Sequence, residues 1–143
     1  MAFKFKVQKA EREKIAAKIA LMGASGCGKS MSALRLATGM VEEMKKLDAL
    51  SGTNGRILLA NTEGSRGRYY ANEFDYDIVD LEPPYNPEMF VELIDYAVDE
   101  KYSVLIIDSS SEEWTGKGGC LELQQQAGGT YQAWGKSFCS LVA

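Results

Sequence analysis

Gly23-Ala24-Ser25-Gly26-Cys27-Gly28-Lys29-Ser30 is the stretch that decides the fold of this 143-residue chain, because it matches the phosphate-binding pattern G-x-x-x-x-G-K-S. Glycines in this pattern let the backbone turn tightly and bring its N–H groups against an anion. The lysine reaches the β- and γ-phosphates, and the serine hydroxyl ligates Mg²⁺ at the start of a helix. We therefore expect ATP and Mg²⁺ as ligands, with Lys29 also catalytic and Ser30 a metal ligand. The expected nucleotide-binding residues are Gly23, Ala24, Ser25, Gly26, Cys27, Gly28, Lys29, Ser30 and Met31.

The segments on either side of the loop have the patterns of a strand and a helix. Residues 18–22 are mostly apolar, and we expect them to form a short buried strand. Strand, loop and helix in this order are the context that the motif requires, and a glycine-rich turn with a solvated lysine is the alternative. After the loop, apolar residues recur at helical spacing to about residue 47, at Ala33, Leu34, Leu36, Ala37, Met40, Val41 and Met44.

Three further strands and one further helix are expected downstream. Residues 56–60 and 103–107 are continuous apolar runs, as buried parallel strands are, and residues 76–81 form a weaker strand. A helix opens at Pro87, directly after Asn86, and its apolar face holds Phe90, Leu93, Ile94 and Ala97. Because strands alternate with helices, we expect an α/β fold with a parallel sheet flanked by helices. We expect one domain over residues 1–143, in which residues 1–17 are a basic N-terminal extension or edge strand.

The composition excludes several classes of protein. Apolar residues make up 45% of the chain and charged residues 25%, as in ordinary globular domains. The chain has no histidine, which excludes a histidine general base and histidine-ligated zinc. Its 3 cysteines cannot all pair, no apolar run reaches membrane-spanning length, and the N-terminal residues lack the apolar core of a signal peptide. We therefore expect a cytoplasmic protein with no membrane partner.

Charge is distributed unevenly along the chain. Residues 1–60 carry 11 basic and 5 acidic side chains, whereas residues 61–113 carry 3 basic and 14 acidic ones. Such asymmetry can mark an electrostatic face for nucleic acid. We favour the simpler explanation of a basic extension followed by acidic helices, because phosphate contacts dominate DNA affinity and an acidic domain provides few of them.

Polar side chains follow the predicted strands at the edge where open parallel sheets bind ligands. Residues 104–107 followed by Asp108 have the form of a Walker B strand, which holds one carboxylate where it orients Mg²⁺. Hydrolysis also needs a group that orients the attacking water, and we assign that catalytic role to Glu63 at the end of the second strand. The alternatives are an N-cap role for Asp108 and a solvated turn position for Glu63.

This set of motifs resembles the RecA-like ATPases, which share the phosphate loop, a glutamate after a neighbouring strand and a Walker B strand ending in Asp-Ser, here Asp108-Ser109. More closely, the chain resembles the phage- and prophage-encoded AAA-type nucleotide-binding proteins of RecA-like fold. The resemblance implies a P-loop NTPase that acts in phage DNA recombination or replication within a bacterial host, with single-stranded DNA as a partner. It covers nearly the whole chain from about Phe3, through residues 18–36, 58–70, 81–84, 104–121 and 131–136.

The chain departs from that family in two places. Residues 111–113 read Ser-Glu-Glu where the family tends to have histidine. The sequence also ends 35 residues after Asp108, whereas such proteins continue through another helix and a strand that carries a γ-phosphate sensor. We therefore expect a domain that is incomplete at its C-terminus, with a sheet that lacks its last core strand. Either the chain is a truncated form of such a protein, or a second copy or a protein partner completes the edge of the sheet.

Several other residues are weaker candidates, each with a structural alternative. Glu112 and Glu113 are the alternatives to Glu63 for orienting water, or are surface charges near Trp114. Arg66 and Arg68 could contact phosphate or act across a subunit interface, or simply be solvated. Aromatic rings could stack on a base or pack internally, namely Tyr69, Tyr70 and Trp134. The glycine-rich stretches 115–119 and 127–130 could contact DNA or serve as connectors.

The sequence thus predicts Mg-dependent ATP binding and hydrolysis by a RecA-like core. Two other functions stay open at this point. A non-hydrolysing nucleotide-binding module would use the nucleotide to stabilise the fold or to control assembly with a partner. A small-molecule or nucleotide kinase would need a cationic lid after the Walker B strand, where the chain offers only Lys117 and Lys136.

Overall fold

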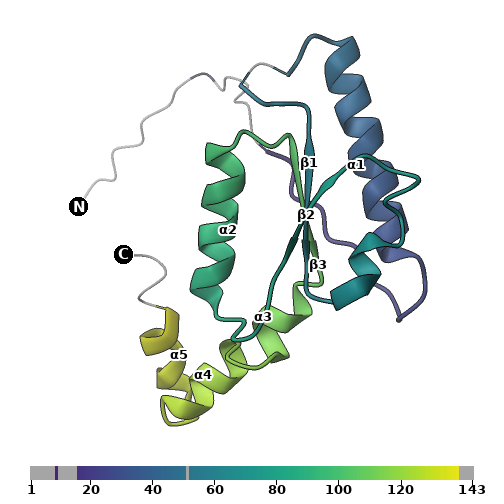
Figure 1. Cartoon of the computed structure of the whole chain (residues 1–143). Coiled ribbons are helices and arrows are strands. Elements are labelled where there is room, and N and C mark those ends of the chain that lie inside the picture. The colour runs from purple at the N-terminus through teal and green to yellow at the C-terminus, as the bar shows by residue number, and fades with distance from the viewer. Residues whose placement is uncertain (1–8, 10–15, 51, 139–143) are drawn as a thin grey trace.

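Three parallel strands form the centre of the protein, in the order β2–β1–β3 (Figure 1). The computed structural model describes residue 9, residues 16–50 and residues 52–138, with side chains through residue 134. β1 spans Ile57–Asn61, β2 spans Asp77–Asp80 and β3 spans Val104–Asp108. The last residues of the three strands are level with one another, so Asn61, Asp80 and Asp108 meet at one end of the sheet.

Alternate residues of β1 pack on opposite faces of the sheet. Ile57 lies in a buried cluster with Ala37, whereas Leu58 lies in a second cluster with Leu93 on the other face. All five residues of β1 are buried, because β1 is the central strand and a helix covers each face. This double burial explains why the strand reads as a continuous apolar run and not as an alternating one.

The two longest helices lie on opposite faces of the sheet (Figure 1). α1 spans Lys29–Lys46 and follows the phosphate loop directly, burying Leu34, Ala37 and Val41. α2 spans Pro87–Asp99 and begins as predicted: the side chain of Asn86 accepts a hydrogen bond from the backbone N–H of Met89 at 2.8 Å. The predicted α/β class, a parallel sheet flanked by helices, is confirmed.

The prediction of a buried strand at residues 18–22 is wrong. These residues have no strand structure, and Ile19, Leu21 and Met22 are exposed. Within the described part of the chain, β3 pairs with β1 and has no strand on its other side, so its residues are half-buried. An apolar run becomes a strand only when a partner satisfies its backbone groups, and the sequence pattern does not report that partner.

The buried face of α2 is also narrower than predicted. Phe90, Leu93 and Ala97 are buried as expected, but Ile94 is 46% exposed. The predicted extension or edge strand at residues 1–17 lies largely outside the described residues.

Short helices follow the strands at the end of the sheet where Asn61 and Asp108 lie (Figure 1). A 3-10 segment, η1, spans Gly64–Arg68 and follows β1 closely. After β3, α3 spans Ser111–Thr115, α4 spans Cys120–Gln126 and α5 spans Tyr131–Phe138. The rings of Trp114 and Trp134 stack with centroids 5.3 Å apart, which joins α3 to α5 in one lobe.

Candidate functional site

The phosphate loop, residues 23–28, connects the exposed residues 18–22 to the start of α1. Gly26 (φ 78°) and Gly28 (φ 86°) have left-handed backbone conformations, which glycine adopts without a steric penalty. Gly28 is the N-cap of α1, and no side chain in the described residues caps that end of the helix. The first N–H groups of α1 therefore face outward at the positive end of the helix dipole, which is the arrangement that binds anions.

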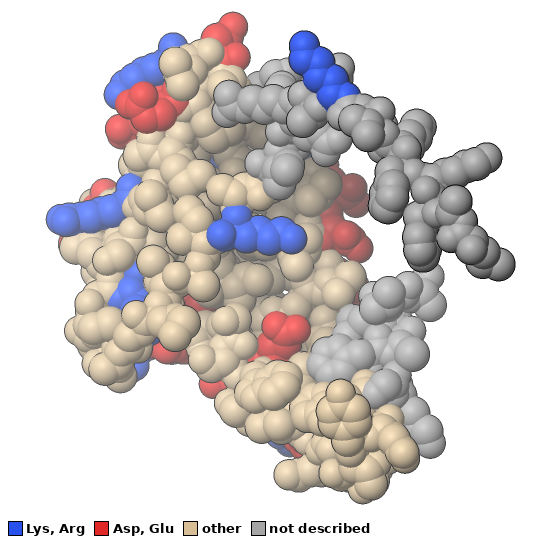
Figure 2. Space-filling model, turned by 180° about the vertical axis from the view of Figure 1, so that it is seen from behind, with Lys and Arg blue, Asp and Glu red and all other residues tan. Residues whose placement is uncertain are grey.

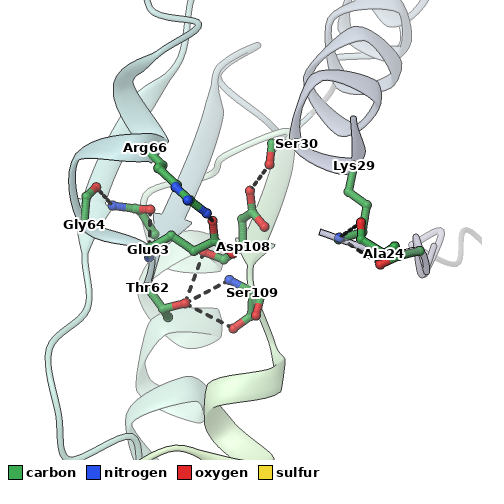
Figure 3. Close-up of polar contacts among 11 residues, drawn as sticks. Ala24, Lys29, Ser30, Thr62, Glu63, Gly64, Arg66, Asp108 and Ser109 are labelled. Atoms are coloured by element: carbon green, nitrogen blue, oxygen red, sulfur yellow. Dashed lines mark hydrogen bonds and ion pairs between the residues drawn. The ribbon is translucent and has the colours of Figure 1, made fainter. Parts of the chain in front are cut away.

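The predicted nucleotide-binding residues divide between this loop and the first turn of α1. Residues 23–27 are exposed, and residues 28–31, which include Met31, are half-buried. The Nζ atom of Lys29 donates to the carbonyl oxygens of Gly23 at 2.9 Å and Ala24 at 3.0 Å (Figure 3). An ammonium group has three donors, so Lys29 can close the loop and still donate to a phosphate.

Ser30 and Asp108 are in direct contact at the end of the sheet. The Ser30 hydroxyl donates to Oδ2 of Asp108, although the two residues are 78 positions apart in the sequence (Figure 3). The fold therefore brings together the two motifs that were recognised separately. Asp108 is not the N-cap of the next helix, because Ser110 occupies that position.

A hydroxyl and a carboxylate are oxygen ligands of the kind that Mg²⁺ prefers. Mg²⁺ commonly takes one or two protein ligands and completes its shell with water and phosphate oxygens. Among the described residues, no three His, Cys, Asp or Glu side chains gather in a way that could hold a metal. The Ser30–Asp108 pair thus fits Mg²⁺ bound together with a nucleotide and does not fit an all-protein metal cage.

Glu63 lies at the same end of the sheet, at the start of η1 (Figure 3). Its side chain is 43% exposed, and its Oε2 is 3.5 Å from Nη1 of Arg66. The register of β1 and β3 brings Glu63 and Asp108 to neighbouring strand ends. Because exposed ion pairs of this kind contribute little free energy, the carboxylate can turn toward a ligand at the end of the sheet.

Thr62, which the sequence analysis did not single out, ties the ends of β1 and β3 together (Figure 3). Its backbone N–H donates to the carbonyl oxygen of Asp108 at 2.8 Å, and the backbone N–H of Ser109 donates to its Oγ1 at 2.9 Å. These bonds fix the distance between the backbone segment that carries Glu63 and the segment that carries Asp108. The polar run after an apolar strand was the available signal.

Asn61, Asp80 and Arg68 form a second network that the sequence analysis missed. Asn61 is 1% exposed, and its Nδ2 donates to Oδ1 of Asp80 at 2.7 Å. The Arg68 guanidinium donates to both oxygens of Asp80, at 3.1 and 2.5 Å. The hydrogen bonds from Arg68 and, to a smaller extent, from Asn61 lower the pKa of Asp80. The hydrogen bond to Asp80 and the charge of that carboxylate raise the pKa of Arg68. Arg68 thus binds another residue of this molecule. The feature that could have revealed this network is an asparagine at the end of a buried strand, where its amide needs hydrogen-bond partners.

Glu112 and Glu113 lie in α3, which follows β3. Burial raises the pKa of Glu113, and burial followed by the charge of Glu113 raises the pKa of Cys120. The glycine-rich stretch 115–119 is closely packed: a Cβ on Gly118 would lie 2.5 Å from Cβ of Pro84. Such packing favours the connector interpretation of this stretch.

The aromatic candidates occupy two settings. Tyr69 is 70% exposed beside η1, and Tyr70 is half-buried. Trp134 stacks on Trp114, and Tyr131 in the same lobe is 91% exposed. Charged side chains are sparse over this lobe on the face seen in Figure 2. On that face, the described residues of this lobe therefore offer few of the cationic side chains that dominate DNA affinity.

No described helix is long and apolar enough to span a bilayer. Comparison with protein-family models, with curated proteins and with solved structures finds no match for this chain.

Proposed function

We propose that this protein binds Mg·ATP at the carboxyl end of its sheet and hydrolyses it, as a P-loop NTPase with a RecA-like core. The observation that carries the proposal is the hydrogen bond from Ser30 to Asp108. Two motifs 78 residues apart, each expected to contribute one magnesium ligand, meet at one point beside an uncapped helix N-terminus. A glycine-rich turn with an unrelated lysine would have no reason to meet the end of β3.

Each residue of the site would have a separate role in phosphate chemistry. The N–H groups of the phosphate loop would hold the phosphates, with Lys29 donating to them. Ser30 and Asp108 would hold Mg²⁺, which supplies neutralisation of charge on the phosphate oxygens. Glu63 would accept a hydrogen bond from the attacking water and orient it in line with the γ-phosphate.

Glu63 needs to change partner for this role, because its carboxylate is paired with Arg66. The pair is exposed, with 64% of the Arg66 side chain accessible, so separating the two charges costs little. Arg66 would then be available to a phosphate oxygen.

The same pairing favours a second candidate function, a nucleotide-binding module without hydrolysis. If Glu63 stays with Arg66 when the nucleotide binds, no carboxylate orients water, and binding alone would act on the fold or on assembly. The outer edge of β3, unpaired within the described chain, gives such a module a surface for a second copy or a partner strand.

The resemblance noted in the sequence extends the proposal to biology. A RecA-like core of this kind would act in the bacterial cytoplasm, in phage DNA recombination or replication, with single-stranded DNA as a partner.

The experiment measures Mg·ATP binding by calorimetry and phosphate release at steady state, with and without single-stranded DNA. Lys29→Ala is expected to weaken binding at least about tenfold. Glu63→Gln is expected to keep binding within about twofold while turnover falls on the order of 100-fold. The matched controls are Lys46→Ala, at the far end of α1, and Glu73→Gln, an exposed carboxylate beyond η1.

The outcomes separate the two functions. Turnover that Glu63→Gln removes establishes the ATPase, and stimulation by DNA would support the recombination role. Binding that depends on Lys29 without turnover supports the non-hydrolysing module. Absence of Lys29-dependent binding contradicts both.

A further inference from the structure

We infer that Asn61 is a positioning residue for Glu63, with its side-chain amide oriented by Asp80 and Arg68. The inference rests on the proposed function, because it assigns to Asn61 the task of placing the carboxylate that orients water. Asn61 is the last residue of the central strand and the only polar residue among the buried side chains of the described chain.

The side chain of Asn61 binds the backbone on both sides of the Glu63 peptide. Its Oδ1 accepts from the N–H of Glu63 at 3.1 Å, and its Nδ2 donates to the carbonyl oxygen of Gly64 at 2.6 Å. Two backbone atoms within one turn are thus fastened to a side chain that is itself fixed in the sheet. The position from which the Glu63 side chain leaves the backbone is set by these bonds.

Asp80 and the carbonyl oxygen of Gly64 together determine which way the Asn61 amide faces. An ionised carboxylate only accepts hydrogen bonds, so the NH₂ group of Asn61 has to face Oδ1 of Asp80, at 2.7 Å. The amide oxygen then faces the N–H of Glu63. Arg68 keeps Asp80 ionised and in place through two hydrogen bonds from its guanidinium.

Close packing leaves the turn little freedom to move away from Asn61. A Cβ on Gly67 would lie 2.6 Å from Cγ of Asn61, so the backbone of η1 rests directly on the amide. The hydroxyl of Tyr76 donates to the carbonyl oxygen of Gly67 at 2.6 Å and holds η1 from the side. Thr62 links the same turn to the backbone of Asp108. Glu63 is therefore placed relative to the proposed metal ligand by a continuous set of contacts.

The test reverses the donor and the acceptor of the Asn61–Asp80 pair. Asn61→Asp places two carboxylates together, and kcat for ATP is expected to fall on the order of 100-fold while the Kd for Mg·ATP stays within about twofold. Asn61→Asp combined with Asp80→Asn restores one donor and one acceptor between these two positions but not the donor to the Gly64 carbonyl oxygen, so kcat is expected to recover in part, by about tenfold. If Asn61 only stabilised the fold, Asn61→Asp would change Kd and kcat together, and the double variant would show no such recovery.

Arg68→Met tests the outer end of the network at an exposed position, where a substitution is not expected to prevent folding. It is expected to lower kcat about threefold to tenfold without changing the Kd. Arg56→Met is the matched control: Arg56 pairs with Asp77 at 2.5 Å at the opposite end of the same two strands, with similar exposure. Equal losses in the two arginine variants would overturn the inference.

Hydrogen exchange at the Glu63 amide gives a readout that does not depend on turnover. Asn61→Asp retains an acceptor but loses the donor that orients it, so exchange at Glu63 is expected to speed up about tenfold or more and to slow again in the double variant. Unchanged exchange in Asn61→Asp overturns the inference, as does a kcat equal to that of the parent chain. A parent chain that binds Mg·ATP without turnover contradicts hydrolysis, and the exchange result then decides the placement of Glu63 alone.

Discussion

Two loops border the same end of the sheet, and they are held in opposite ways. The turn after β1, residues 61–68, is fastened by a buried asparagine, an ion pair and the backbone of β3. The phosphate loop, residues 23–28, is exposed along most of its length and is closed by the ammonium group of its own Lys29. The backbone of one wall of the proposed site is thus preformed, and only the Glu63 side chain has to leave Arg66, whereas the other wall has backbone groups still available to a ligand.

The two loops therefore have different tasks in the proposed site. A group that orients water has to be in place before the reaction, because catalysis depends on its position. A loop that surrounds phosphate gains hydrogen bonds when the ligand arrives and need not be rigid before. The comparison therefore predicts local differences in stability that can be measured on the free protein.

Amide hydrogen exchange should show the largest contrast. The N–H of Thr62 is bonded to Asp108 within the sheet, and we expect its exchange to be slower than that of the phosphate loop, at Gly26 for example, by about 1,000-fold. Mg·ATP should slow exchange in the phosphate loop and leave Thr62 unchanged. Equal protection of the two loops in the free protein would contradict the expected difference in their local stability.

Added methyl groups should separate the two loops by stability. A Cβ on Gly67 would lie 2.6 and 2.7 Å from Cγ and Oδ1 of Asn61 and 2.9 Å from Cδ1 of Ile78, so Gly67→Ala should lower the free energy of unfolding by about 3 kcal/mol. Gly26→Ala meets nothing within 4 Å and carries only the penalty of a positive φ, about 1 kcal/mol. Urea unfolding checks both values, and a larger loss for Gly26→Ala would reverse the comparison.

Ser30 joins the phosphate-loop side of the site to the sheet, so its removal should have an intermediate effect. Ser30→Ala leaves the carboxylate of Asp108 without this donor, and we expect a loss of about 1 kcal/mol in the free energy of unfolding. Ser32→Ala, an exposed serine in the same helix, is the control and should change stability little. Equal urea midpoints for the parent and Ser30→Ala would mean that the contact contributes nothing without a ligand.

Acid should weaken the fastened turn through Asp80, with a small effect. The hydrogen bonds from Arg68 and then Asn61 lower the pKa of Asp80 below its ordinary value of 3.8. A folded-state pKa below the unfolded one stabilises the protein above about pH 4, and that contribution is lost as the pH falls through the folded-state value.

Urea midpoints between pH 7 and pH 2.5 test this linkage. Asp80→Asn should be less stable than the parent at pH 7, and the difference should shrink as the pH falls below about 4. Arg68→Met removes the same pairing from the other side and should show the same convergence. A difference that stays constant with pH would exclude the charge of Asp80 as its cause.

Much of this site could be predicted from the sequence, because each of its parts is a local pattern and one rule about parallel sheets brings the parts together. The phosphate loop, α1 and the apolar run before Asp108 are recognisable within windows of a few residues. Parallel strands present their carboxyl ends at one edge, and that rule was enough to expect Ser30 and Asp108 together. The same reasoning placed Glu63 at the correct end of the sheet.

The features that were missed depend on partners far away in the sequence. Residues 18–22 have the composition of a strand, but strand formation needs a paired neighbour, which the described chain does not supply. The Asn61–Asp80 bond depends on the register of β1 against β2, which no local pattern specifies. The polar run that starts at Asn61 was expected at the ligand-binding edge of the sheet, but the burial of the Asn61 side chain was not predicted.

The order of the strands also has a consequence for how the chain leaves the ribosome. β1 occupies the centre of the sheet, and the residues paired with Asn61 follow it by 19 positions in β2 and by 47 in β3. At translation rates of about 5–20 residues per second, one edge of the most buried strand therefore stays unpaired for seconds after β2 has been made. A nascent chain paused between Asp80 and Val104 would present that open edge to chaperones and to other nascent chains. Codon choice over this interval should accordingly influence the yield of folded protein more than codon choice upstream of β1.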